Sequence, residues 1–160
     1  MRFIQGPRCV TCKKNAKELN VLKLNRCSSC KVVNYCSTTC QRKDFKSHQY
    51  VCGRINNAAN YLDESKSELQ SRNYFLKFKG KFIRGGNELT QEYYSNKLLL
   101  ARLIWFLALR HESYEATEIV KNNLIEMTEL EWEASALNIG PWLCFIHLFL
   151  GMYLSMVNCI

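Results

Sequence analysis

The fold is decided by one stretch, CSSCKVVNYCSTTCQRKDFKSHQYVC, which runs from Cys27 to Cys52. It holds three pairs of side chains that bind transition metals: Cys27-x2-Cys30, Cys36-x3-Cys40 and His48-x3-Cys52. A fourth pair, Cys9-x2-Cys12, lies fourteen residues upstream of the stretch. Zinc in structural sites takes four ligands in a tetrahedron, so these eight ligands predict two closed zinc sites.

The spacing within each pair has a physical reason. A C-x2-C turn lets two thiolates converge on one ion, and ligands at i and i+4 lie on one face of a helical turn. Residues 37–50 contain few apolar side chains besides Phe45 and Tyr50, so a helix there would not be stable alone. We therefore expect bound metal to supply much of the folding free energy, about 10–16 kcal/mol per structural zinc.

The cysteines also indicate a compartment. Seven of the nine lie between Cys9 and Cys52, and residues 1–7 lack the continuous apolar core of a secretory signal. Dense cysteines without such a signal are typical of metal ligands rather than disulfides, which favours the cytoplasm or the nucleus. A site closed by four protein ligands has no open position for water, so no catalytic metal is expected.

The spacing alone leaves the grouping of the four pairs open. Sequential grouping would join the first pair to the second and the third to the fourth. Interleaved grouping would join the first pair to the third and the second to the fourth. RING and PHD fingers also cross-brace two zinc ions, but their ligand spacings differ from this one.

The ligand pattern resembles the MYND-type zinc finger. The match covers all eight ligands, the Tyr before Cys36, the Ser after it and the Gln after Cys40; one departure is Phe45, where the family usually has Trp. The family arrangement is interleaved. The resemblance therefore implies a first zinc site of Cys9, Cys12, Cys36 and Cys40, and a second of Cys27, Cys30, His48 and Cys52.

The same resemblance implies a function. MYND-like fingers are protein-interaction modules that take short proline-containing peptides, laid as an extra strand against a small sheet. By match to the motif, Ser37, Gln41 and Phe45 are the expected peptide contacts. Residues 31–35 are rich in β-branched side chains and suit a short strand, in which we expect Val33 and Tyr35 to pack around the zinc.

Charge gives a second interpretation of the finger. Residues 1–52 carry a net charge of +9 and residues 53–160 a net charge of −1. Seven thiolates and two zinc ions would bring the finger to +6, which favours acidic partners or phosphates. A nucleic-acid-associated regulatory zinc protein is thus an alternative, although no helix carries base-reading side chains at groove spacing. The basic residues that could bind phosphates are Lys13, Lys14, Lys17, Lys23, Arg26, Lys31, Arg42, Lys43 and Lys46.

After a lead of residues 1–8 and the finger of residues 9–52, residues 53–160 are predicted to be α-helical. Gly53 can end the finger's last helix or let it turn, and residues 54–72 have the pattern of one amphipathic helix. Residues 73–88 are expected to form a connector. A largely apolar helix over 91–110, with Thr90 as its N-cap, and a helix after Ser113 would form an αα-hairpin.

Residues 73–140 weakly resemble the helical region of uncharacterised MYND-type proteins, through Asn73, Phe75, Gly80, Phe82 and the run from Glu92. This resemblance implies no activity. Some MYND fingers sit inside SET-type methyltransferases, but the sequence shows neither an Asn-His-Ser-Cys-like stretch nor any P-loop or dinucleotide signature. We therefore expect no enzyme.

The stretch 142–160 contains no charged residue, and Pro141 suits the first turn of a helix. Nineteen helical residues span about 28 Å, close to the thickness of a bilayer core. A transmembrane tail anchor facing the cytosol, in a fragment of a larger MYND protein, is therefore one hypothesis. The favoured alternative is that 141–160 is the last helix of the bundle, because no basic cluster precedes it.

Overall fold

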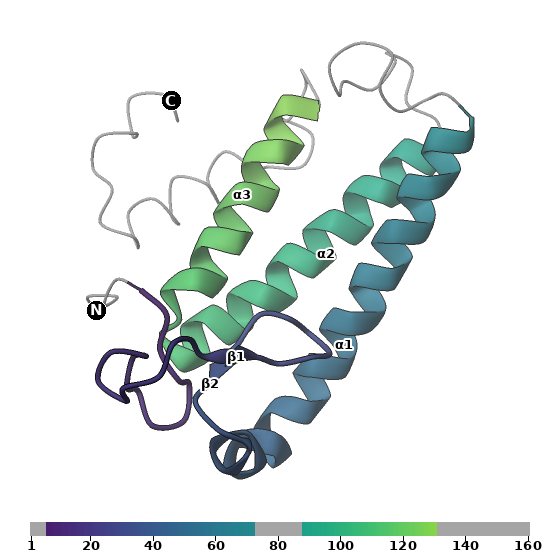
Figure 1. Cartoon of the computed structure of the whole chain (residues 1–160). Coiled ribbons are helices and arrows are strands. Elements are labelled where there is room, and N and C mark those ends of the chain that lie inside the picture. The colour runs from purple at the N-terminus through teal and green to yellow at the C-terminus, as the bar shows by residue number, and fades with distance from the viewer. Residues whose placement is uncertain (1–5, 73–87, 131–160) are drawn as a thin grey trace.

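The computed structural model describes residues 6–72 and 88–130 and has a small finger at one end of three helices (Figure 1). The elements in chain order are β1 (Asn25–Arg26), β2 (Asn34–Tyr35), α1 (Thr38–Ser71), α2 (Glu88–His111) and α3 (Tyr114–Leu130). The predicted fold class, a two-zinc finger with short strands followed by a helical region, is confirmed.

Two C-x2-C turns of the same shape build the finger. The N–H of Lys13 donates to the carbonyl of Cys9 at 2.8 Å, and the N–H of Lys31 donates to the carbonyl of Cys27 at 2.9 Å. Both lysines have left-handed backbones, with φ of 63° and 56°. A non-glycine residue in this region costs free energy, so closure of each turn around a metal ion is the interaction that can offset the cost.

The two strands form a short antiparallel ladder. Asn25 pairs with Tyr35 and Arg26 with Asn34, while a parallel bridge joins Cys9 to Asn34 on the other side of β2. The second strand is thus the central one and is fully buried, whereas both residues of β1 are exposed. The predicted strand over 31–35 is present in its last two residues.

Helix α1 is longer than the sequence pattern indicates. Ser37 is its N-cap, with the Cys40 N–H donating to the Ser37 hydroxyl at 3.2 Å. The helix then continues through Gly53, so the expectation that Gly53 can end it is wrong, and the amphipathic pattern of 54–72 is the second part of the same helix. A glycine inside a helix costs only about 1 kcal/mol, which packing of Val51, Cys52 and Ile55 on either side can outweigh.

Helices α2 and α3 form the predicted hairpin. The Ser113 hydroxyl accepts from the Ala116 N–H at 3.3 Å, which confirms Ser113 as the cap of α3. Thr90, however, lies within α2 and is buried, so its assignment as the N-cap of that helix is wrong. Glu112, with a φ of 50°, makes the tight turn between the two helices.

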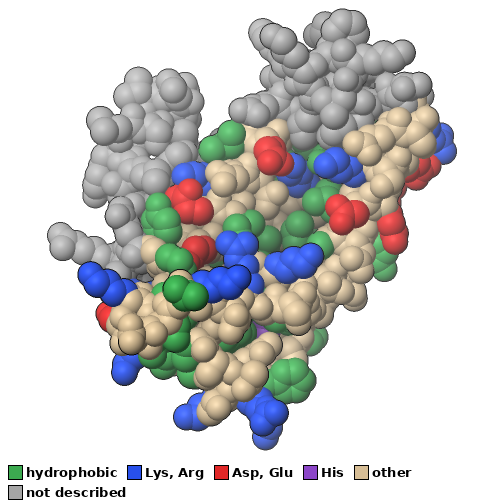
Figure 2. All heavy atoms as spheres, in the orientation of Figure 1, with side chains coloured by type: hydrophobic (Ala, Val, Ile, Leu, Met, Phe, Trp, Pro, Cys, Tyr) green, Lys and Arg blue, Asp and Glu red, His purple; other side chains and the backbone are tan. Residues whose placement is uncertain are grey.

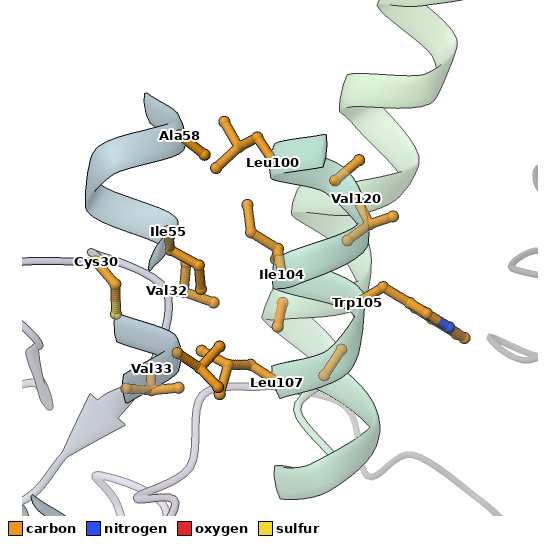
Figure 3. Close-up of a cluster of buried hydrophobic side chains, with 14 of the residues drawn as sticks. Cys30, Val32, Val33, Ile55, Ala58, Leu100, Ile104, Trp105, Leu107 and Val120 are labelled. Atoms are coloured by element: carbon orange, nitrogen blue, oxygen red, sulfur yellow. The ribbon is translucent and has the colours of Figure 1, made fainter. Parts of the chain in front are cut away.

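One hydrophobic core joins the finger to the helices. Val32 and Val33 of the finger, Ile55 of α1 and Leu107 of α2 belong to the same cluster and point into the same space (Figure 3). Val33 and Leu107 are each 0% exposed, and Ile55 is 2% exposed. The finger is therefore packed on α2 as well as being continuous with α1.

Several predictions fall on residues outside the described ranges. These are the connector after residue 72, the resemblance carried by residues 73–82, and the helix expected over 141–160. Among the helices that the structure describes, none combines the length and the apolar character needed to cross a membrane.

Candidate metal centre

The first ligand cluster consists of four cysteine thiols whose sulfur atoms all lie within 4.8 Å of one another: Cys9, Cys12, Cys36 and Cys40. The sulfur of Cys36 lies 3.7 Å from that of Cys12 and 3.4 Å from that of Cys40. Four sulfurs around one zinc at a bond length of about 2.3 Å would stand about 3.8 Å apart. The separations and the four thiol donors therefore fit a tetrahedral zinc site, the first zinc site.

The second cluster, which forms the second zinc site, has three cysteines and one histidine, all buried: Cys27, Cys30, His48 and Cys52. The sulfurs of Cys27 and Cys52 are 3.7 Å apart, and the Cys30 sulfur lies 3.5 Å from Nε2 of His48. For a zinc–nitrogen bond of about 2.0–2.1 Å, a tetrahedron places nitrogen about 3.6 Å from sulfur. This cluster also fits zinc, with Nε2 as the nitrogen donor, and together the two clusters fit the two predicted zinc ions.

The two clusters are interleaved along the chain rather than sequential. The Cys9–Cys12 turn shares its site with Cys36 and Cys40, which flank the start of α1. The Cys27–Cys30 turn shares its site with His48 and Cys52, farther along the same helix. Cys36 precedes the Ser37 cap, so it lies outside the helix; the expectation that Cys36 and Cys40 share a helical turn is wrong. His48 and Cys52 do share one.

The thiols differ in how readily they ionise before metal arrives. Burial acts to raise the pKa of Cys9, but backbone N–H groups around its sulfur outweigh this and lower the pKa to about 7. Burial raises the pKa of Cys30 to about 12, and the neighbouring Cys27 and Cys52 sulfurs add to the rise. Because zinc binds the thiolate, loading of the second site must displace the Cys30 proton.

The imidazole of His48 lies near two side chains that the ligand pattern does not reveal, the buried Tyr35 and the partly buried Asp44. The Tyr35 ring meets the His48 ring edge-on, with centroids 6.1 Å apart, and its hydroxyl donates to Oδ2 of Asp44 at 2.8 Å. Tyr35 is 2% exposed, which confirms that it packs in the finger. Asp44 lies one helical turn before His48, a spacing that could have indicated the contact.

The predicted peptide contacts lie on the first turns of α1. Gln41 and Phe45, four residues apart, lie on one face of the helix, and Ser37 is the cap that precedes it. Phe45 is 56% exposed, whereas Gln41 is half-buried and the Ser37 hydroxyl is engaged as the helix cap. Their role in binding a peptide stays a prediction.

The surface of the finger is basic with exposed apolar side chains. On the face shown in Figure 2, the charged side chains in the part where Figure 1 places the finger are mostly Lys and Arg. Leu22, in the loop before β1, is fully exposed, and Val21 beside it is 41% exposed. Scattered exposed apolar side chains are common on protein surfaces, so Leu22 and Val21 do not by themselves mark a binding site.

Comparison with known proteins agrees with the geometry. Residues 9–52 match the family model of the MYND finger. The chain is 43% identical over 47 residues to Tudor domain-containing protein 1 of Mus musculus, a match covering 29% of this chain and 4% of that protein. It is 37% identical over 82 residues to a SET and MYND domain-containing protein of Dictyostelium discoideum, covering 51% of this chain and 14% of that protein.

A third relative is the zinc finger MYND domain-containing protein 10 homolog of Drosophila melanogaster, 43% identical over 44 residues, or 28% of this chain and 8% of that protein. The chain thus spans less than a sixth of the length of each of these relatives. No solved structure matches it. Residues 9–52 form a MYND-type finger, a zinc-binding module known for protein–protein interaction.

Proposed function

We propose that this chain is a non-catalytic adaptor whose finger captures short proline-containing peptides by adding them as a strand to β1. The observation that carries the proposal is the open outer edge of β1. Among the described residues, β1 pairs only with β2, and both of its residues are exposed. An exposed edge of this kind is a template for an extended peptide.

The hydrogen-bonding groups of Arg26 define that edge. The N–H of Cys27 donates to the carbonyl of Val33 at 2.9 Å, so residue 27 faces β2. Backbone groups alternate in direction along an antiparallel strand, and those of Arg26 therefore point away from β2. The Arg26 N–H and C=O can bind one residue of an added peptide, which suits a short motif better than a long strand.

Side chains near the edge and on α1 would supply selectivity. Leu22 and Phe45 offer exposed apolar surface to proline rings, which have no N–H and prefer extended backbone. Gln41 offers an amide to the peptide backbone. The Ser37 hydroxyl already accepts from Cys40, so it would act as a donor to the peptide.

Other functions fit less well. Four protein ligands close each zinc site, which leaves no position for a substrate or a reactive water. Binding to nucleic acid is the second candidate because of the basic surface in Figure 2. Phosphate binding of that kind would weaken steeply with salt, whereas strand addition would not. We propose the cytoplasm or the nucleus as the site of action.

The experiment is a binding screen of the zinc-loaded full chain against a library of peptides with a fixed central proline. The best peptide is then remade with single N-methyl groups along its backbone. Strand addition at Arg26 predicts that methylation of one peptide N–H, the one that donates to the Arg26 carbonyl, abolishes binding while methylation at the adjacent residues is tolerated. Equal tolerance at every residue would remove the strand-addition mode.

Two matched variants on one helix test the side-chain contacts. Phe45→Ala should weaken peptide binding at least tenfold, whereas Tyr61→Ala should leave it unchanged. Phe45 is 56% and Tyr61 59% exposed, both on α1, but only Phe45 lies in the finger. Equal effects of the two changes would exclude the proposed surface, and salt-sensitive binding to random duplex DNA in place of peptide binding would favour the second candidate.

A further inference from the structure

His111 is a buried polar residue at the last position of α2, far in sequence from the zinc ligands. It is 9% exposed, and its Nε2 has no hydrogen-bond partner among the described residues. That nitrogen lies 4.0 Å from Oδ2 of Asp44. Burial lowers the pKa of His111, so the imidazole is neutral at pH 7 and the contact is not an ion pair.

Asp44 connects His111 to the second zinc site. Its carboxylate accepts from the Tyr35 hydroxyl at 2.8 Å and from the Ser47 hydroxyl at 2.6 Å. Ligand-type atoms of Asp44, His48 and His111 all lie within 4.8 Å of one another. His48 uses Nε2 on the sulfur side, and its Nδ1 is buried with no hydrogen-bond partner in the described chain.

A histidine that binds zinc almost always donates its other N–H to a carboxylate, a carbonyl or a water. Among the described residues, the carboxylate of Asp44 lies within 4.8 Å of a ring nitrogen of His48, which makes it the candidate acceptor for Nδ1–H. The orientation of the Asp44 carboxylate therefore sets the orientation of the His48 ring, and with it the direction of Nε2 toward the metal. Two hydrogen bonds from the finger, donated by Tyr35 and Ser47, fix the orientation of the carboxylate, and a third group, Nε2 of His111, lies 4.0 Å from the same carboxylate.

The third group, His111, reaches the site from outside the finger, and its position is held by further contacts. Nη1 of Arg110 donates to the carbonyl of Ser47 at 3.1 Å, and Nζ of Lys13 donates to the carbonyl of His111 at 3.0 Å. The carboxyl end of α2 is thus hydrogen-bonded to Lys13, next to the Cys9–Cys12 turn, and to Ser47 of α1. Leu107, one helical turn before His111, belongs to the core that α2 shares with the finger (Figure 3).

We propose that His111 is a positioning residue of the second zinc site, holding Asp44 so that its carboxylate receives Nδ1–H of His48. In consequence, α2 completes the outer shell of a metal site whose four ligands all lie in the finger. Changes to such outer-shell partners typically weaken metal binding by about 10–100-fold. This inference does not depend on what the finger binds.

The trio of Asp44, His48 and His111 does not suit a third metal ion. The Asp44 oxygens already accept from two hydroxyls, and the charged side chains of Lys13 and Arg110 lie close enough to disfavour protonation of His111. The same positive charges would oppose a further cation. The zinc count of the wild-type chain tests this point directly.

The experiment uses the full chain loaded with zinc and, in parallel, with cobalt, whose visible bands differ between a site of four thiolates and a site of three thiolates and one imidazole. His111→Ala should lower the metal affinity of the second zinc site about tenfold in competition with a chelator. The first zinc site should keep its affinity. His111→Gln retains an N–H at the place of Nε2 and should restore most of the loss.

Three comparisons can overturn the proposal. Leu109→Ala, at a 41% exposed position two residues earlier on α2, should leave both sites unchanged. In a chain that already carries Asp44→Asn, His111→Ala should have no additional effect on the second zinc site. Equal weakening of both sites, an additive effect of the two changes, or a third zinc that His111→Ala removes would each contradict the proposal.

If His111→Ala does not fold, the folded variants His111→Gln and Asp44→Asn decide the question. The proposal requires His111→Gln to keep the affinity of the second zinc site and Asp44→Asn to lose it. Retention of that affinity in Asp44→Asn, or its loss in His111→Gln, would contradict the proposal.

Discussion

Leu107→Ala tests whether the finger and the helices unfold as one unit. Leu107 is 0% exposed and lies in the cluster that contains Val33 of the finger and Ile55 of α1 (Figure 3). Removing a buried leucine side chain costs about 2–5 kcal/mol, the larger values applying where neighbours cannot relax into the space. The finger backbone is braced by two metal ions, so we expect about 3–4 kcal/mol.

The assay is thermal unfolding of the zinc-loaded chain, followed by helix content and by zinc release to a chromogenic chelator. For a chain of this size, about 3 kcal/mol corresponds to a decrease of about 6–12 °C in Tm. Both signals should shift together because the core is shared. Leu109→Ala, on the same helix but 41% exposed, should cost less than about 1 kcal/mol.

The reasoning would be refuted if Leu107→Ala shifted the loss of helix content without shifting zinc release. That result would mean that the finger unfolds independently of α2, in spite of the common cluster. It would also be refuted if Leu107→Ala and Leu109→Ala had equal effects, since burial would then not decide the cost.

Three further predictions concern the metal sites and a helix cap. Cys30→Ser should leave one bound zinc, in the first zinc site, as counted by native mass spectrometry. Zinc affinity should fall as the pH is lowered, because protons compete with zinc for the thiolates. The pKa of Cys9 is about 7, so its contribution to this pH dependence should level off above pH 7, whereas Cys30, with a pKa of about 12, should contribute at every pH tested. Competition titrations with a chelator from about pH 6 to 9 measure both contributions. Ser113→Ala should lower the free energy of unfolding by about 1 kcal/mol in denaturant titrations, and Ser113→Asp should retain the cap.

The ligand pattern predicts two zinc sites and their eight ligands, whereas the interleaved grouping of those ligands comes from the family resemblance. Paired cysteines and one histidine at fixed spacing carry the chemistry of zinc in the sequence itself, and the hairpin of α2 and α3 follows from apolar periodicity and the Ser113 cap. The end of the helix predicted at Gly53 is wrong, because local propensity favours a stop at glycine whereas burial of Val51, Cys52 and Ile55 on both sides favours continuation of the helix. The start of α2 predicted from Thr90 is wrong for a similar reason, since a residue type that often caps helices can also be buried inside one.

The environment of the second site could not be read from the sequence in full. Asp44 stands four residues before His48, so helical spacing could have suggested their contact. His111 lies 63 residues after His48, and its approach depends on how α2 packs against the finger. Such a contact is set by tertiary packing, for which periodicity along one helix carries no signal.

The most direct test of the account is the number of zinc ions that the full chain binds, and what their removal does to the finger. Native mass spectrometry should show two zinc ions, and a strong chelator should remove both while the finger loses its tertiary structure. A chain that holds one zinc or none, or a finger that stays folded without metal, would contradict the account.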